Sequence, residues 1–110
     1  MALATIRAPA DVRVVSEDLL QLFNQQVTNE LEASQLYLAA SVWFDQADMI
    51  GMSKFMRRES DDERHHAILF IDFANKRNMH IRLDTVQAPD ADWATPEEVW
   101  EDLLEGEKEN

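Results

Sequence analysis

Three side chains able to bind a metal interrupt the apolar stripe of one long predicted helix. In residues 52–77, alternate steps of four and three residues pick out Met52, Met56, Glu59, Glu63, His66, Phe70, Phe73 and Arg77. This spacing is typical of the inward face of a helix in a bundle. Charged side chains are rarely buried on such a face unless they are paired or bind a metal. The stripe therefore predicts a long helix with a polar site at its middle.

The preceding segment carries a matching stripe with a single charge. Alternate steps of three and four residues give Leu20, Phe23, Val27, Glu30, Ser34, Tyr37, Ser41 and Phe44. Glu30 is the charge, and Tyr37 lies two turns further along the same face. Ser16 followed by two acids is a helix start, and residues 48–51 form a turn. We expect helices over about 16–47 and 50–77, which the short turn makes antiparallel.

Facing stripes on an antiparallel pair would bring Glu30 towards Glu63 and His66. The last two residues are three apart, so they project from adjacent turns of one helix face. A glutamate from one helix with a Glu-x-x-His motif from another is the half-site of a carboxylate-bridged di-iron centre. Carboxylate oxygens with one imidazole suit iron, with manganese and zinc as competitors. The pair of stripes therefore predicts a metal centre between the two helices.

The rest of the chain predicts a long connection and a third helix. Residues 78–94 have no helical period and can carry the chain from one end of a bundle to the other. Thr95-Pro96-Glu97-Glu98 is a strong helix start. Trp100, Leu103 and Glu107 continue the stepping, so Glu107 is a further inward carboxylate. We expect a mobile N-terminal arm over residues 1–15 and one all-α, antiparallel bundle domain over residues 16–110.

Composition narrows the possible partners. The chain has 110 residues, with 22 acidic against 10 basic side chains and a net charge of −12. Nucleic acid is therefore not an expected partner, whereas an acidic surface attracts cations. Cysteine is absent, which excludes a thiolate metal site. The sequence has no apolar run of the roughly 18–20 residues that cross a bilayer, so we expect no membrane partner.

Several short segments of the sequence form a collinear set of motifs from about residue 16 to residue 110. They are Asn29-Glu30-Leu31-Glu32-Ala33-Ser34 with Tyr37-Leu38, Trp43-Phe44-Asp45, Glu63-Arg64-His65-His66-Ala67, Phe73-Ala74-Asn75-Lys76-Arg77, Asp92-Trp93 and Glu107-Lys108. In these motifs the chain resembles the ferritin family, and the residues are most similar to those of ferritins from marine diatoms and related microbes.

The resemblance implies a role for each candidate site residue. Glu30 and His66 would be terminal ligands of a first iron, and Glu63 would bridge two irons. Glu107 would bind the second iron. Tyr37 would lie beside the centre as a one-electron donor, and Glu59 matches a position that helps to bind a third iron in some microbial ferritins.

The same resemblance implies a ferroxidase that oxidises Fe(II) with O2 and stores ferric mineral in a shell of 24 subunits. A ferritin subunit also needs the rest of the third helix and a fourth helix, and neither is present. We therefore expect a partial chain whose minimum unit is a dimer. The alternatives are a half-length ferritin-like protein with its site between subunits, and a non-catalytic helical dimer. A cytoplasmic location is expected, or a plastid one in a eukaryote.

Each residue also has a purely structural interpretation. A single inward glutamate such as Glu30 often pairs with a basic residue, Tyr37 can be a packed tyrosine with its hydroxyl bonded, and Glu59 can line a solvated wall. Met49, Met52, Met56 and Met79 are interpreted as core filler. With no fourth helix, we expect a full apolar stripe to stay uncovered in a monomer, made of Phe23, Val27, Phe44, Met56, Phe70 and Phe73.

Overall fold

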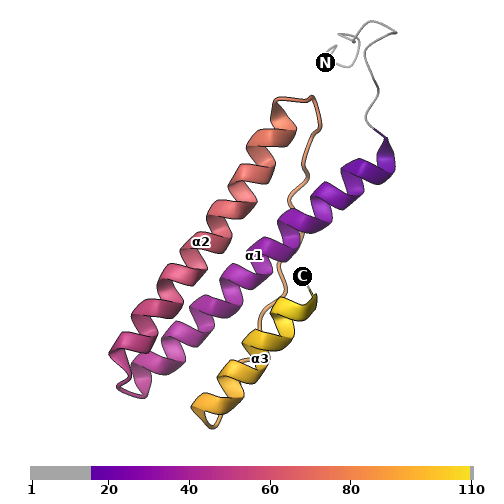
Figure 1. The fold of residues 1–110 in the computed structure, drawn as a ribbon. Helices are drawn as coiled ribbons and strands as arrows, with labels where there is room; N and C mark the ends of the chain where they lie inside the picture. The colour runs from indigo at the N-terminus through magenta and orange to yellow at the C-terminus, as the bar shows by residue number, and fades with distance from the viewer. Residues whose placement is uncertain (1–15, 110) are drawn as a thin grey trace, which may run out of the picture.

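The computed structural model describes residues 16–109, and this part of the chain holds three helices and no strand (Figure 1). Helix α1 spans Glu17–Gln46, α2 spans Ile50–Asn75 and α3 spans Pro96–Glu109. Helices α1 and α2 form a long antiparallel hairpin, and α3 lies against α1 near the turn. The all-α prediction is confirmed. The expected N-terminal arm over 1–15 lies outside the described residues.

Helices α1 and α3 begin directly after the capping residues predicted from the sequence, Ser16 and Thr95. The Leu19 amide donates to Ser16 Oγ at 3.0 Å, which satisfies one of the amides left free at a helix start. At α3 the Glu98 amide donates to Thr95 Oγ1 at 3.2 Å, and Glu98 Oε1 accepts from the Ala94 amide at 3.0 Å. This reciprocal pair is close to a capping box, so both predicted helix starts are confirmed.

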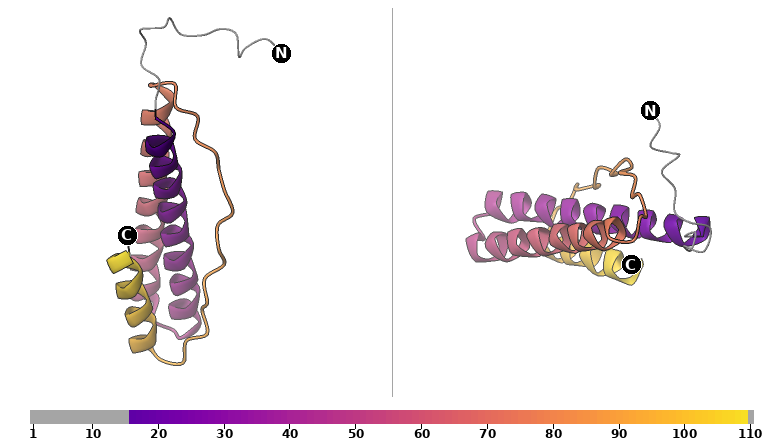
Figure 2. Two further views of the ribbon diagram at one scale, coloured as in Figure 1. Left: turned by 90° about the vertical axis from the view of Figure 1, so that its right-hand side faces the viewer. Right: turned by 90° about the horizontal axis from the view of Figure 1, so that it is seen from above.

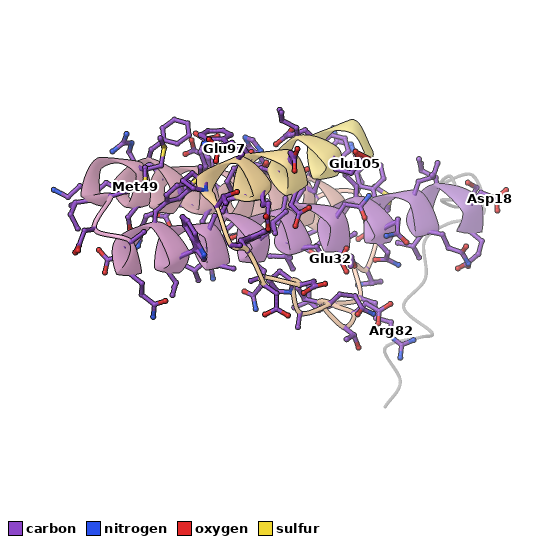
Figure 3. The ribbon with its side chains drawn as sticks, turned by 90° about the horizontal axis from the view of Figure 1, so that it is seen from below. Asp18, Glu32, Met49, Arg82, Glu97 and Glu105 are labelled. Atoms are coloured by element: carbon purple, nitrogen blue, oxygen red, sulfur yellow. The ribbon has the colours of Figure 1, made fainter. Side chains whose placement is uncertain are left out.

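The turn between α1 and α2 is short, and α2 begins at Ile50 as expected. Asp48 adopts a φ of 59°, a left-handed conformation that Asp and Asn tolerate better than most residues. The Met49 amide then bonds back to the Phe44 carbonyl at 2.8 Å. Because α2 begins at Ile50, Gly51 is already helical. Met49 points outward at the turn (Figure 3) and is 36% exposed, so its interpretation as core filler was wrong.

A second left-handed residue ends α2 earlier than expected. Asn78 has a φ of 58°, and the Met79 amide bonds to the Ala74 carbonyl at 3.0 Å. Backbone turns of this kind commonly close helix C-termini. The helix therefore stops at Asn75, two residues before the expected end at 77. Met79 itself is buried, in line with its predicted packing role.

Serine hydroxyls tie α1 to α2. Ser34 Oγ donates to the Ser60 carbonyl at 2.8 Å, and Ser60 Oγ donates to the Ser34 carbonyl at 2.7 Å. Nearer the turn, Ser53 Oγ donates to the Ser41 carbonyl at 2.8 Å. Small side chains at these points let the two backbones approach closely. The hydrogen bonds satisfy hydroxyls that would be costly to bury unpaired.

The buried face of α2 differs from the predicted stripe. Small residues form much of it, and its fully buried members are Ser53, Met56, Ser60, Ala67 and Ala74. The predicted stripe shares only Met56 with this set. Glu59 and Glu63 are partly buried, while His66 and Phe73 are exposed. The prediction assigned the large apolar side chains of α2 to its buried face. In the structure the smallest side chains lie there, because they make the closest contact between the two helices.

The core is concentrated at the turn end, under α3. It joins side chains from both long helices and from α3, and the cluster consists of Tyr37, Ala40, Phe44, Met56, Trp93, Val99 and Leu103. The expected uncovered stripe was therefore wrong in part. Val27, Phe44 and Met56 are 0–1% exposed within the single chain. Phe23 and Phe70 are only partly buried, and Phe73 is 42% exposed.

The long connection runs back along α1 to the start of α3, as expected (Figure 2). Two side chains of α1 hold it: Asn24 Oδ1 accepts from the Arg82 amide at 2.9 Å, and Glu32 Oε2 accepts from the Gln87 amide at 3.2 Å. Figure 3 shows Glu32 and Arg82 on this side of α1. The route makes α3 parallel to α2. Among the described helices, none combines the length and apolarity of a membrane span.

Candidate metal centre

Glu30 provides a buried carboxylate at the middle of α1. The residue is 8% exposed. Gln26, one turn earlier, donates from Nε2 to Glu30 Oε2 at 2.9 Å. That bond orients the carboxylate so that Oε1 faces α2, where it lies 3.1 Å from His66 Nδ1. The sequence analysis missed Gln26, although a glutamine four residues from an acid on a helix is a recognisable hydrogen-bonding pair.

Glu63 and His66 meet Glu30 from α2. His66 Nδ1 lies 3.1 Å from Glu63 Oε1, the same distance as from Glu30 Oε1. One ligand atom from each of the three residues lies within 4.8 Å of the others. The structure therefore brings together the three residues that the facing stripes predicted. His66 is not buried as the stripe implied, because its side chain is 53% exposed while those of Glu30 and Glu63 are 10% and 15% exposed.

Two of these three side chains, Glu63 and His66, have pKa values raised by their surroundings. Burial, followed by a hydrogen bond with the Glu30 carboxyl, raises the pKa of Glu63 to about 7. The hydrogen bond to Glu63 raises the pKa of His66 above its ordinary value, although partial burial opposes this change. A carboxylate whose pKa is raised by burial and by a neighbouring carboxyl offers a site to a cation, because a bound metal ion replaces the proton and neutralises the charge.

Glu107 lies beside this group through Tyr37. The Tyr37 hydroxyl donates to Glu107 Oε1 at 2.7 Å, across 70 residues of sequence. Burial first, and then the Glu107 carboxylate, raise the pKa of Tyr37 above its usual range. The charge of Glu107 also helps to raise the pKa of Glu63. Tyr37 is therefore both packed and bonded, and α3 brings a further carboxylate to the edge of the centre.

Glu59 stands apart from the three ligand candidates. It is partly buried one turn from Glu63, and its charge contributes to raising the pKa of Tyr37. In the described part of the chain, the group that could hold a metal consists of Glu30, Glu63 and His66, without Glu59 or Glu107. The two outer carboxylates thus flank the centre. Their ligand roles remain predictions.

Aromatic side chains border the exposed side of His66. A hollow of about 380 Å³ is lined by Phe23, His66, Leu69, Phe70 and Phe73. Phe23 stacks on Phe73 with ring centroids 5.7 Å apart and meets Phe70 edge-on at 5.8 Å. The candidate centre therefore has an apolar surface on this side, and that surface is open to solvent.

The donor set fits a metal ion by its chemistry. The carboxylates of Glu30 and Glu63 offer up to four oxygen atoms, and an imidazole nitrogen of His66 lies beside them. The charge of Glu107 is close enough to affect the pKa of Glu63. Hard oxygen donors with imidazole suit iron or manganese, and also zinc. In carboxylate-bridged di-iron bundles the same residue types project inward from facing helices. The residues present are thus consistent with iron.

Comparison with known proteins agrees with this fold. Residues 20–110 match the model of a ferritin-like domain, under the family name Ferritin. The chain belongs to the ferritin family. A bacterial non-heme ferritin of Bacteroides fragilis is 32% identical over 95 residues, which cover 86% of this chain and 60% of that protein. Soma ferritin of Lymnaea stagnalis is 36% identical over 88 residues, covering 77% of this chain and 51% of that protein.

Solved ferritin structures align with the chain as a whole. The apo-ferritin from Pseudo-nitzschia multiseries is 55% identical with a TM-score of 0.82, and the alignment covers 86% of this chain and 60% of that one. An iron-soaked variant of PmFTN aligns equally well, at 55% identity and a TM-score of 0.82. The resemblance to diatom ferritin is therefore confirmed. The chain spans about three fifths of the length of these relatives.

Proposed function

We propose that the chain binds Fe(II) at Glu30, Glu63 and His66 and oxidises it with O2, in the service of iron storage. The observation that carries this proposal is the convergence of three ligand atoms within 4.8 Å, in a chain of the ferritin family. The iron-soaked neighbour structures support iron as the metal. Two Fe(II) ions at one centre supply the two electrons that reduce O2 to the peroxide level.

The position of each residue determines its proposed role in binding iron. Glu30 and His66 bind the first ion from opposite helices, while Glu63 lies between that ion and the side of the centre where Glu107 approaches. Iron binding would displace the proton that the raised pKa of Glu63 favours, since a carboxylate must be deprotonated to act as a ligand. Two carboxylates and a neutral imidazole would leave two positive charges on a bound pair of divalent ions, so each further carboxylate would offset one of them. Glu107 is placed to supply that charge to the second ion.

Tyr37 and Glu59 act beside the centre rather than in it. Tyr37 donates a hydrogen bond to Glu107, so the phenol can give one electron to O2 reacting at the centre while its proton passes to that carboxylate. Glu59, one turn along α2 from Glu63, binds a third iron or relays iron away after oxidation. A Glu59→Ala variant should oxidise its first iron at the normal rate and turn over slowly. Loss of the first rapid phase would contradict this role.

The decisive experiment removes the carboxylate between the two expected iron positions. Glu63→Ala should abolish fast Fe(II) oxidation in stopped-flow measurements of ferric absorbance. Glu105→Ala is the matched control, because Glu105 is an exposed glutamate on α3. Fast oxidation that survives in Glu63→Ala would show that this residue does not bind the reacting iron. Anaerobic titration with Fe(II) separates lost binding from lost oxidation.

Assembly is part of the proposal. A shell of 24 subunits, the arrangement implied by the family resemblance, would surround stored ferric mineral. The second candidate is a small homo-oligomer with the centre near a subunit contact, which the open apolar hollow beside His66 favours. Light scattering distinguishes a shell, a dimer and a 12.7 kDa monomer. A monodisperse, well-folded monomer would exclude both oligomers for this chain.

A further inference from the structure

A basic hollow lies at the turn end of the hairpin, apart from the metal centre. Its volume is about 410 Å³, and its lining comes only from α1 and α2: Asp45, Ile50, Ser53, Lys54, Arg57 and Arg58. Three of the ten basic residues of the chain fall within five positions of α2 there. Because they are spaced at i, i+3 and i+4, they share one face of the helix.

These cations have no acidic partner among the described residues. The ion pairs found in that part of the chain join His66 to Glu30 and to Glu63, and none involves Lys54, Arg57 or Arg58. Asp45 lines the same hollow but lies beyond ion-pair distance of them. The lining therefore carries two more positive than negative charges, in a molecule whose net charge is −12.

The start of α2 does not oppose this charge. Its first turn contains no acidic residue, and Met49 gives the helix no side-chain cap. By contrast, α1 and α3 both begin with acids in the first turn. Ile50, the first residue of α2, lines the hollow, so the positive end of the helix dipole adds to the potential of the three cations there.

The Ser53 hydroxyl donates to the Ser41 carbonyl at 2.8 Å, so its proton is already used and the charged donors of the hollow come from the three basic residues. Arg58 lies with its guanidinium carbon 6.0 Å from the Phe55 ring centroid. This distance is at the outer limit of a cation–π contact, and such a contact leaves the guanidinium donors free to bind two oxygens of one anion. Arginine pairs and a neighbouring lysine are the usual binders of phosphate oxygens.

We propose that this hollow binds an inorganic oxyanion of the phosphate type. Three cations on one helix face, with no ion pair among the described residues, attract a compact, multiply charged tetrahedral anion more strongly than a single carboxylate. The volume exceeds the need of one such ion, so the anion binds with part of its hydration shell. The site is independent of the proposed oxidation chemistry, since no lining residue is a candidate ligand of the metal centre.

The test is calorimetric titration of the metal-free chain with inorganic phosphate. The pocket variant Arg57→Gln/Arg58→Gln should weaken phosphate binding by at least about tenfold, as expected for the loss of two charge-assisted contacts. The control Lys76→Gln/Arg82→Gln removes the same two charges from exposed positions outside the hollow. It should bind phosphate as the unchanged chain does. Lys54→Gln should give a smaller loss than the double variant.

Three results would overturn the proposal. One is the absence of measurable phosphate binding by the unchanged chain. Another is equal weakening in the pocket and control variants, which would mean that total charge rather than the hollow governs binding. The third is unchanged affinity in the pocket variant, provided that circular dichroism shows the same helix content. All four side chains replaced in the two double variants are exposed, so both variants should fold.

Discussion

The two ends of the α1–α2 hairpin differ in how they bury their apolar side chains. At the turn end, α3 covers Phe44 and Met56, which are both 0% exposed. At the opposite end Phe23 stacks on Phe73 and meets Phe70 edge-on, with no helix above them in the described chain, and Phe73 is 42% exposed. One sequence thus makes a closed core and an open apolar surface on a single pair of helices.

The candidate metal centre lies on the boundary between these ends. Glu30 is buried, whereas the His66 side chain is more than half exposed toward the open end. The centre therefore has one protected side and one solvent-accessible side. The candidate ligands are therefore positioned by α1 and α2 alone. Their enclosure from solvent depends on what covers the open end of the hairpin. Covering that end would strengthen the electrostatic attraction between the carboxylates and a bound ion.

The largest expected effect is a contrast between two phenylalanines. Phe44→Ala should lower the free energy of unfolding by about 3–5 kcal/mol, the usual cost of a large cavity in a closed core. Phe73→Ala should cost about 1 kcal/mol, because its ring is partly exposed and loses mainly its stacking on Phe23 and its contact with Arg77. Urea denaturation followed by circular dichroism measures both. Equal losses would show that the open end is closed in solution, for instance by a second subunit.

Metal binding at the boundary should give the next largest effect. Zn(II), a redox-silent substitute, should stabilise the folded chain by about 2.7 kcal/mol when present at a hundred times its dissociation constant. Glu30→Ala should abolish this gain, because the variant loses the buried ligand from α1. Glu105→Ala, which changes an exposed glutamate, should keep it. Zinc stabilisation that persists in Glu30→Ala would place the metal elsewhere.

The closed end was largely predictable from sequence, and the reasons are local. The predicted stripe of α1 agrees with its buried residues at Val27, Glu30, Tyr37, Ser41 and Phe44. Caps at the starts of α1 and α3 depend on residues adjacent in sequence, so their patterns are easily recognised. The ligand candidates were predictable because charge on an inward helix face is costly without a partner.

What could not be predicted depends on packing between distant residues. The buried face of α2 follows Ser53, Ser60, Ala67 and Ala74, whose small size gives no hydrophobic signal. The exposure of His66 depends on which surfaces α3 reaches. The hydrogen bond between Tyr37 and Glu107 depends on the route of the long connection. None of these features leaves a local pattern in the sequence.

The pH dependence of the metal-free chain should reveal the charge at the boundary. The pKa of Glu63 rises from 4.5 to about 7 on folding. Between these values the unfolded chain releases a proton that the folded chain keeps, so this residue stabilises the fold at low pH and loses that contribution as the pH rises to about 7. The raised pKa of His66 has the same sign and extends the loss above 6.5.

Glu63→Gln isolates this contribution from that of the other acids. The variant keeps the shape of the side chain but cannot titrate, and it removes the partner that raises the pKa of His66. Thermal melting from pH 5 to pH 8 should therefore show a smaller fall in stability for Glu63→Gln than for the unchanged chain. Parallel melting profiles would mean that the carboxylates at the boundary titrate normally, which would leave the centre too well solvated for strong metal binding.

The smallest expected effect tests the link between the closed end and the centre. Tyr37→Phe removes the hydroxyl that donates to Glu107 at 2.7 Å but keeps the ring packed in the core. The loss should be about 0.5–1.5 kcal/mol, as for a single hydrogen bond, because Glu107 is exposed and can bond to water instead. Hydrogen exchange should accelerate in the last turn of α3 while α1 and α2 stay protected. If exchange in α3 is unchanged, its end is held by Leu103 packing alone, and Glu107 is not fixed beside the metal centre.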